Sequence, residues 1–162
     1  MSLSISTLSR LEYQHKTIRE LISDMPEERL RRRIHPDKWS AFENIAHLAA
    51  YQPVFFQRLQ RMQNESDPEF NRYIADQDPE FQTMLAMTLP QVLFDLDQQR
   101  GLLVTTLNEM DDATLSRTGR HPKYGRFPIS KWTEFFLLHE AHHMYTVFML
   151  VQDLHKDMHK TL

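Results

Sequence analysis

Apolar residues recur every three or four positions over most of the chain, a spacing that places them on one face of an α-helix. The spacing is clearest in four long segments, at about residues 4–24, 40–64, 88–110 and 130–154. No long segment alternates apolar and polar residues as a half-buried strand does, and the sequence has only three glycines. The pattern therefore predicts an all-helical protein with four long helices.

Local signals place the starts of two of these helices. Ser40 and Glu43 have the spacing of a capping box, in which each side chain bonds a free backbone N–H of the other's turn. A second capping box, with a proline in the first turn, opens the third helix at residues 88–91. Pro53 lies inside the second helix, where a proline removes a backbone hydrogen bond and crowds the preceding turn. We therefore expect a kink or break just past His47.

The connecting segments predict how the helices are joined. Residues 66–87 are less periodic and contain two prolines, so we expect short helical pieces that cross between the halves of the molecule. Residues 111–129 hold two of the three glycines and are expected to form a loop, after which Ser130 caps the fourth helix. The chain is expected to form one domain over residues 1–162, a four-helix bundle with a long crossover between its second and third helices.

Composition and charge narrow the classes of partner. The net charge is -3 and the sequence pI is near 6.3, so we expect neither nucleic acid nor an anionic membrane as a partner. The basic run at residues 29–33 is interpreted as a solvated helix end. The absence of cysteine excludes disulfides, thiolate ligands and a cysteine nucleophile. Without a visible signal peptide or membrane span, a cytoplasmic location is the expectation.

Histidines carry the chemical signal. His139 and His143 are four residues apart, which places both imidazoles on one helix face about a turn apart. His47 lies far upstream in the second helix, and a facing helix can bring it to the pair. Three imidazoles with one open coordination position is the layout of a catalytic metal site. Spacing alone does not exclude His142, three residues from His139, in place of His143, and histidines satisfied by hydrogen bonds are the structural alternative.

Two other metal sites share parts of this pattern. Residues 139–143 match the H-E-x-x-H motif of zinc proteases, but the further downstream ligand that those enzymes need is missing. Di-iron carboxylate bundles use E-x-x-H pairs from two helices, which Glu12 with His15 and Glu140 with His143 would supply. The order of these pairs along the chain is wrong for that class, which also requires two metals per chain. We therefore prefer a site for one metal.

Two motifs resemble the DinB/YfiT-like superfamily. The stretch at residues 35–48 is similar to its W-S-x-x-E-x-x-x-H-L signature, and the stretch from Arg120 to the H-E-x-H-H of the fourth helix is similar to its second signature. The resemblance implies an up-down-down-up four-helix bundle, commonly dimeric, with a divalent metal held by His47, His139 and His143. Many members follow the last histidine with Gly-Gln, whereas Met-Tyr-Thr stands at residues 144–146 here.

The expected function is a metal-dependent enzyme acting on a small molecule, either a hydrolase or a small-thiol-dependent transferase. Imidazole ligands suit zinc, nickel or iron. The resemblance adds the low-molecular-weight thiol, since some relatives transfer such thiols. Glu140, beside His139, is a candidate base, and no other catalytic residue is assigned. The groups considered for contact with substrate are Tyr51, Gln52, His15 and Tyr145.

The alternative is a non-catalytic metal- or ligand-binding bundle. The aromatic and methionine side chains of the fourth helix could equally form the interface of a homodimer, which the resemblance also implies.

Overall fold

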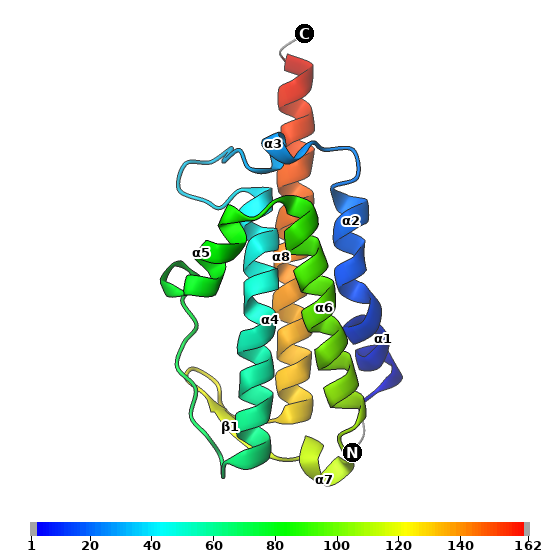
Figure 1. Ribbon diagram of the computed structural model, residues 1–162, viewed down its shortest axis with the longest axis vertical. Coiled ribbons are helices and arrows are strands. Elements are labelled where there is room, and N and C mark those ends of the chain that lie inside the picture. Colours follow the sequence, from blue (N-terminus) through cyan, green and yellow to red (C-terminus); the bar gives the residue numbers. More distant parts are fainter. Residues whose placement is uncertain (1–2, 161–162) are drawn as a thin grey trace.

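Four long helical segments form a bundle, as the apolar pattern predicted (Figure 1). The computed structural model describes residues 3–160. The first segment consists of α1 (Ile5–Tyr13) and α2 (Thr17–Leu21), joined by the 3₁₀ turn η1 (Gln14–Lys16). The other three are the helices α4 (Ala41–Asn64), α6 (Leu89–Asn108) and α8 (Ile129–Lys160).

The helices run up, down, down and up along the bundle (Figure 1). The short helix α3 (Glu27–Leu30) lies between α2 and α4 at one end. The crossover from α4 to α6 returns the chain along the whole length of the bundle, through η2 (Ala75–Gln77) and α5 (Pro79–Ala86). The short helical pieces predicted for this segment are therefore confirmed. Among residues 3–160, no helix is both long and apolar enough to cross a lipid bilayer.

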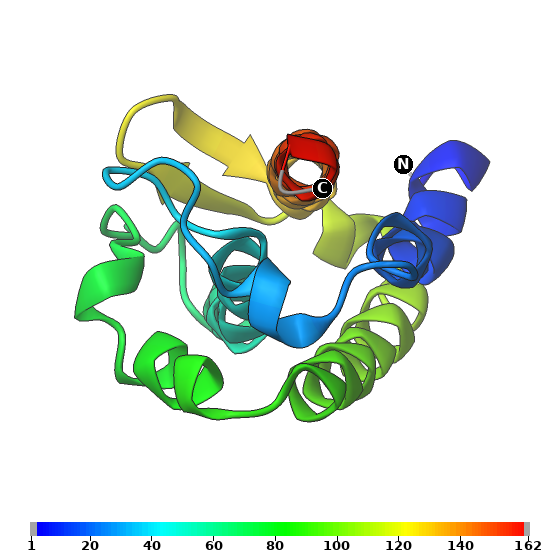
Figure 2. The same cartoon turned by 90° about the horizontal axis from the view of Figure 1, so that it is seen from above.

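Each bundle helix packs against two others. α4 contacts α6 and α8, and α1 contacts the same two helices from the opposite side (Figure 2). The buried side chains form two apolar clusters, one around Leu48 and Leu96 and the other around Phe55 and Phe136. A buried polar layer containing Arg100 separates the two clusters along the bundle.

The two capping boxes expected at helix starts are present, and Pro53 does not interrupt α4. The Ser40 hydroxyl accepts a hydrogen bond from the Glu43 backbone N–H (3.1 Å), and the Glu43 carboxylate accepts one from the Ser40 N–H (2.7 Å). The Gln91 side chain likewise accepts a hydrogen bond from the backbone N–H of residue 88 (2.9 Å). Of the kink or break expected just past His47, the break is absent, because α4 is helical from Ala41 to Asn64 through Pro53. Packing against α6 and α8 on both sides of Pro53 outweighs the lost backbone hydrogen bond, a cost of about 3 kcal/mol.

The segment expected to be a loop at residues 111–129 is partly regular. It holds α7 (Asp112–Leu115) and a hairpin of β1 (Thr118–His121) and β2 (Gly125–Pro128), paired antiparallel with Gly119 opposite Phe127. Gly125 has φ 76°, a conformation that favours glycine at the turn. The second strand leads directly into α8, so Ser130 lies in the first turn of that helix and does not cap it, contrary to expectation.

Side chains fix the hairpin against the end of α4. Asp67 accepts hydrogen bonds from Thr118 (2.8 Å), Arg120 (2.9 Å) and Arg126 (2.6 Å). Arg117 donates to the backbone carbonyl of residue 62 in the last turns of α4 (2.6 Å). These contacts place the hairpin beside the cavity described below.

Candidate metal centre

The three histidines of the predicted site come together between α4 and α8. One ring nitrogen from each of His47, His139 and His143 lies within 4.8 Å of the other two. The Nε2 atoms of His47 and His139 are 3.1 Å apart. His142 is exposed and outside this cluster, so the geometry selects His143 from the two residues that spacing left open.

Asn44 fixes the proton position on His143. The Asn44 side-chain nitrogen donates to the Ser40 carbonyl (2.8 Å), which can only accept, so the amide orientation is determined. Its oxygen therefore faces His143 Nδ1 at 2.8 Å and accepts the proton of that nitrogen. His143 Nε2 is left with a lone pair, as a metal ligand requires. Sequence reasoning missed Asn44, although its position one turn before His47 places it on the same side of α4.

The arrangement fits a bound cation. The Nδ1 atoms of His47 and His139 are buried and have no hydrogen-bond partner among the described residues, so no hydrogen bond there fixes the tautomer of either ring. Their Nε2 atoms approach each other as closely as two ligands of one tetrahedral zinc ion, for which bond lengths of about 2.0–2.1 Å imply a separation of about 3.3 Å. Three imidazoles that converge in this way supply the nitrogen donors of a three-histidine site.

Aromatic side chains bury the cluster. The rings of Trp39 and Tyr73 lie 5.1 and 5.7 Å from the His47 ring, and the Tyr51 ring lies 4.8 Å from the His139 ring, all measured between centroids. Burial is the largest influence on the three histidines and lowers their pKa values, to about 2 for His47, about 4 for His139 and about 3 for His143. All three are therefore neutral at physiological pH, the form that binds metals.

A cavity of about 660 Å³ opens beside the cluster. The three histidines form part of its wall together with Tyr51 and Tyr73, and the hairpin turn at residues 121–124 forms another part. His121 lies outside the metal cluster, and its Nδ1 accepts hydrogen bonds from the backbone N–H groups of residues 123 and 124 (both 3.1 Å). The histidine cluster is thus accessible to a small molecule.

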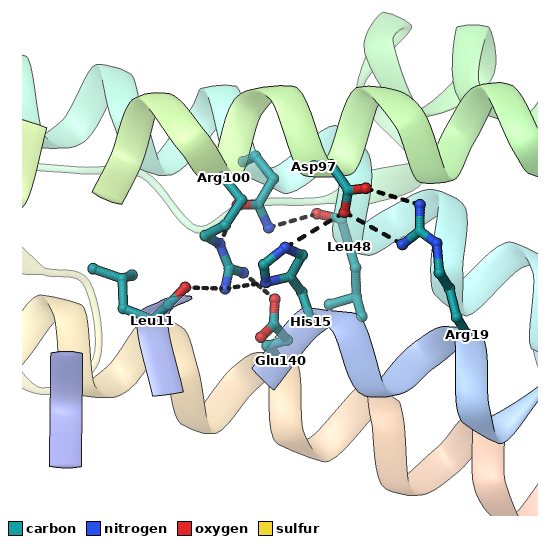
Figure 3. A network of polar contacts seen from close by, with 8 residues as sticks. Leu11, His15, Arg19, Leu48, Asp97, Arg100 and Glu140 are labelled. Atoms are coloured by element: carbon teal, nitrogen blue, oxygen red, sulfur yellow. Dashed lines mark hydrogen bonds and ion pairs between the residues drawn. The ribbon is translucent and has the colours of Figure 1, made fainter. Parts of the chain in front are cut away.

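Glu140 points away from the cavity, contrary to its interpretation as a candidate base. Its carboxylate is completely buried and accepts a hydrogen bond from the Arg100 guanidinium (Figure 3). It accepts a second hydrogen bond from the side chain of Gln14 (3.0 Å). One residue advances the helix by about 100°, so a residue next to His139 faces the bundle interior instead. The structure gives Glu140 a role in the polar layer between the helices.

The same layer contains two more of the residues considered for substrate contact. Arg100 donates to Gln52 (3.1 Å) and to His15 Nδ1 (3.3 Å), and His15 Nε2 lies 3.4 Å from Asp97 (Figure 3). Tyr145 is exposed and does not line the cavity. Of the four residues considered, only Tyr51 lines it.

The two-metal alternative lacks its carboxylates. Glu12 is exposed, and Glu140 is paired with Arg100. Among the side chains that the structure describes, those of residues 3–157, the three-histidine cluster is the one group of three or more potential ligands with the geometry to hold a metal.

Comparisons with known proteins agree with this fold. The model of the DinB superfamily matches residues 10–147. YfiT from Bacillus subtilis, described as a probable metal-dependent hydrolase with an unusual four-helix bundle topology, superimposes with a TM-score of 0.78 at 17% identity, covering 97% of this chain and 90% of that one. No curated protein matches the sequence.

Two further solved structures share the architecture. TT2238, described as a four-helix bundle protein, has a TM-score of 0.64 at 22% identity, covering 88% of this chain and 95% of that one. An uncharacterized protein from Clostridium difficile 630 has a TM-score of 0.66 at 12% identity, covering 93% of this chain and 94% of that one. At these identities the likeness establishes the fold, and the chemistry must be argued from the site.

Proposed function

The chain belongs to the DinB superfamily, and we propose that it is a metal-dependent enzyme in which His47, His139 and His143 hold one divalent cation. The observation that carries the proposal is the convergence of three neutral, buried imidazoles at the wall of a cavity. The description of YfiT as a probable metal-dependent hydrolase supports it by fold alone.

The residues of the chain prepare the site in three ways. Asn44 holds the His143 proton on Nδ1 and directs Nε2 toward the cluster. Trp39, Tyr51 and Tyr73 pack around the imidazoles, and this burial keeps them neutral. Three neutral ligands leave the charge of a divalent cation uncompensated, and such a cation supplies Lewis acidity that lowers the pKa of a water or thiol molecule beside it.

The reaction class we propose is hydrolysis or transfer of a small thiol to a small-molecule substrate. In the second case the thiol enters as a low-molecular-weight co-substrate, because the chain has no cysteine. Zinc, nickel and iron are among the metals whose ligand preferences match three imidazoles.

Metal content per chain tests the proposal. Protein without a histidine tag is analysed by elemental mass spectrometry beside His47→Ala, His143→Ala and the matched control His142→Ala. We expect one metal per chain in the wild type and in the control, and none in the other two variants. Wild-type and variant proteins are then compared for turnover of ester and thiol-transfer substrates. A wild type that binds neither added zinc, nickel nor iron refutes the proposal.

A homodimer formed through α8 is a second proposal, and it is compatible with catalytic and non-catalytic bundles alike. Leu138, Tyr145 and Met149 are 57%, 64% and 43% exposed and recur at intervals of seven and four residues, which aligns them on one face of α8. Sedimentation of the wild type beside Tyr145→Glu tests this interface. We expect the variant to be monomeric with unchanged metal content, and a monomeric wild type contradicts the proposal.

A further inference from the structure

Arg58 is a buried cation at the wall of the cavity. The residue is only 9% exposed, yet it is one of those that line the cavity. Arg58 follows Tyr51 by seven residues and His47 by eleven, so the three lie on one face of α4. The long side chain leans back toward the start of the helix and reaches Tyr51, whose ring contacts the ring of His139.

Neutral groups hold the guanidinium in place. Nη1 donates to the Tyr51 hydroxyl (2.9 Å), and Nη2 donates to the backbone carbonyl of Asn71 (3.0 Å). The rings of Phe70 and Trp132 lie 5.4 and 5.5 Å from its central carbon. A guanidinium has five N–H groups, so three remain after these two hydrogen bonds. The surroundings therefore fix the orientation of the side chain and leave three of its N–H groups able to bind a ligand.

The charge of Arg58 has no counter-ion in the described chain. No carboxylate of the described residues lies within 4.0 Å of its guanidinium. Arg100, the other buried arginine of the described chain, is paired with Glu140. Buried charges in proteins are normally paired, because desolvation otherwise opposes them strongly. Arg58 is thus the exception, and it borders the cavity.

The rest of the cavity wall has the same sign of charge. Arg72 and Lys123 also line it, and neither forms an ion pair with a described carboxylate. No aspartate or glutamate belongs to the lining. Low-dielectric aromatic walls strengthen the field of these cations inside the cavity. An anion that enters meets three positive side chains and no negative one.

We propose that Arg58 binds an anionic group of the substrate, a carboxylate or a phosphate, and thereby holds the rest of the substrate over the three histidines. This inference rests on the proposed function, because it names the substrate class of that site. The planar guanidinium presents paired donors that match two oxygens of either group. The Tyr51 ring lies between Arg58 and the histidines. In the substrate, the reacting group should therefore be separated from the anionic group by about the length of one tyrosine side chain.

A matched pair of probes tests the inference without any mutation. Benzoate and benzamide have nearly the same shape and differ in charge, and inorganic phosphate represents the second oxyanion. Binding is followed by the fluorescence of Trp39 and Trp132, the two tryptophans of the chain. Trp39 lines the cavity, and the ring of Trp132 lies against Arg58. Titrations use the protein as purified and after removal of metal by a chelator. We expect benzoate or phosphate to bind at least about 10-fold more tightly than benzamide in both forms.

Variants then assign the binding to Arg58. Arg58→Gln should weaken binding of the anion by about 10- to 100-fold and leave benzamide unchanged. The control Arg61→Gln, on the same helix and already paired with Glu65, should bind like the wild type. Arg58→Lys keeps the positive charge but loses the paired donors of the guanidinium. Its affinity for the anion should lie between that of Arg58→Gln and that of the wild type. Circular dichroism and urea unfolding confirm that each variant is folded.

The outcomes separate this inference from the proposed function. Anions that bind no more tightly than benzamide, or that bind equally to the wild type and to a folded Arg58→Gln or Arg58→Lys variant, overturn the inference whatever the metal content. Arg58-dependent binding in a wild type that takes up none of zinc, nickel and iron when they are added supports the anion site and refutes the proposed metal-dependent function. The tighter of benzoate and phosphate identifies the anionic group of the substrate.

Discussion

Neutralising Glu140 should destabilise the fold far more than neutralising another paired glutamate of the same helix. The Glu140 and Arg100 side chains are 0% and 1% exposed, so Glu140→Gln leaves a buried guanidinium without its counter-ion. Breaking a buried pair in this way costs about 3–5 kcal/mol. The matched control is Glu134→Gln, because Glu134 pairs with Arg10 at side-chain exposures of 38% and 32%. Solvent screening limits that pair to about 0–1 kcal/mol.

Urea unfolding followed by circular dichroism measures both changes against a total stability of about 5–15 kcal/mol for a domain of this kind. The double variant Arg100→Met with Glu140→Met removes both charges. Its loss of stability should be about 1–3 kcal/mol smaller than the summed losses of the single variants Arg100→Met and Glu140→Met. Metal content per folded chain should remain that of the wild type in Glu140→Gln, because Glu140 points away from the histidines.

Equal destabilisation by Glu140→Gln and Glu134→Gln would refute this reasoning. A loss of turnover in Glu140→Gln without a loss of stability would instead restore Glu140 as a catalytic base.

Three other predictions concern the orienting amide, the buried imidazole and the glycines. Asn44→Leu should lower metal affinity about 10- to 100-fold in a competitive chelator titration, whereas His142→Ala should leave it unchanged. Burial, followed by Arg100, lowers the pKa of His15 to about 4. The unfolded chain therefore takes up this proton first as the pH falls from about 6.5, and up to about 3 kcal/mol of stability is lost by pH 4, a loss that His15→Gln should remove from urea unfolding curves. Gly119→Ala should destabilise by about 1–3 kcal/mol, because its Cβ would lie 2.6 Å from an aromatic carbon. A Cβ added at Gly101, inside α6, would have no atom within 4 Å. Gly101→Ala should therefore raise the free energy of unfolding by about 0.5–1 kcal/mol, which a higher melting temperature would show.

Local patterns predicted the features that depend on short stretches of sequence. The apolar period gave the four bundle helices, and the spacing of Ser40 and Glu43 gave a cap that the structure contains. The four-residue interval between His139 and His143 placed both on one face. His47 joined them in the prediction because a bundle helix can face another, and the structure brings the three together.

Features that depend on distant partners escaped prediction. Glu140 adjoins His139 in sequence, but the residue that pairs with its carboxylate, Arg100, lies on another helix. Asn44 could be assigned only once α4 and α8 were paired. The hairpin at residues 118–128 has weak strand propensity and depends on Asp67 for its position. The sequence did contain a signal for Arg58. It follows Tyr51 by seven residues, a spacing that places both on one face of α4.

The histidines that meet at 3.1 Å are separated by 92 residues of chain, on helices that become neighbours only when the bundle closes. A contact of such long range costs loop-closure entropy that local helix formation does not repay, so it forms late in folding. The unfolded chain holds these imidazoles far apart and binds a cation weakly. A cation bound to the cluster therefore favours the closed topology by mass action, by about 2.7 kcal/mol at one hundred times its Kd. The free energy of unfolding would then depend on the supply of metal, and the melting temperature would rise with the concentration of free metal.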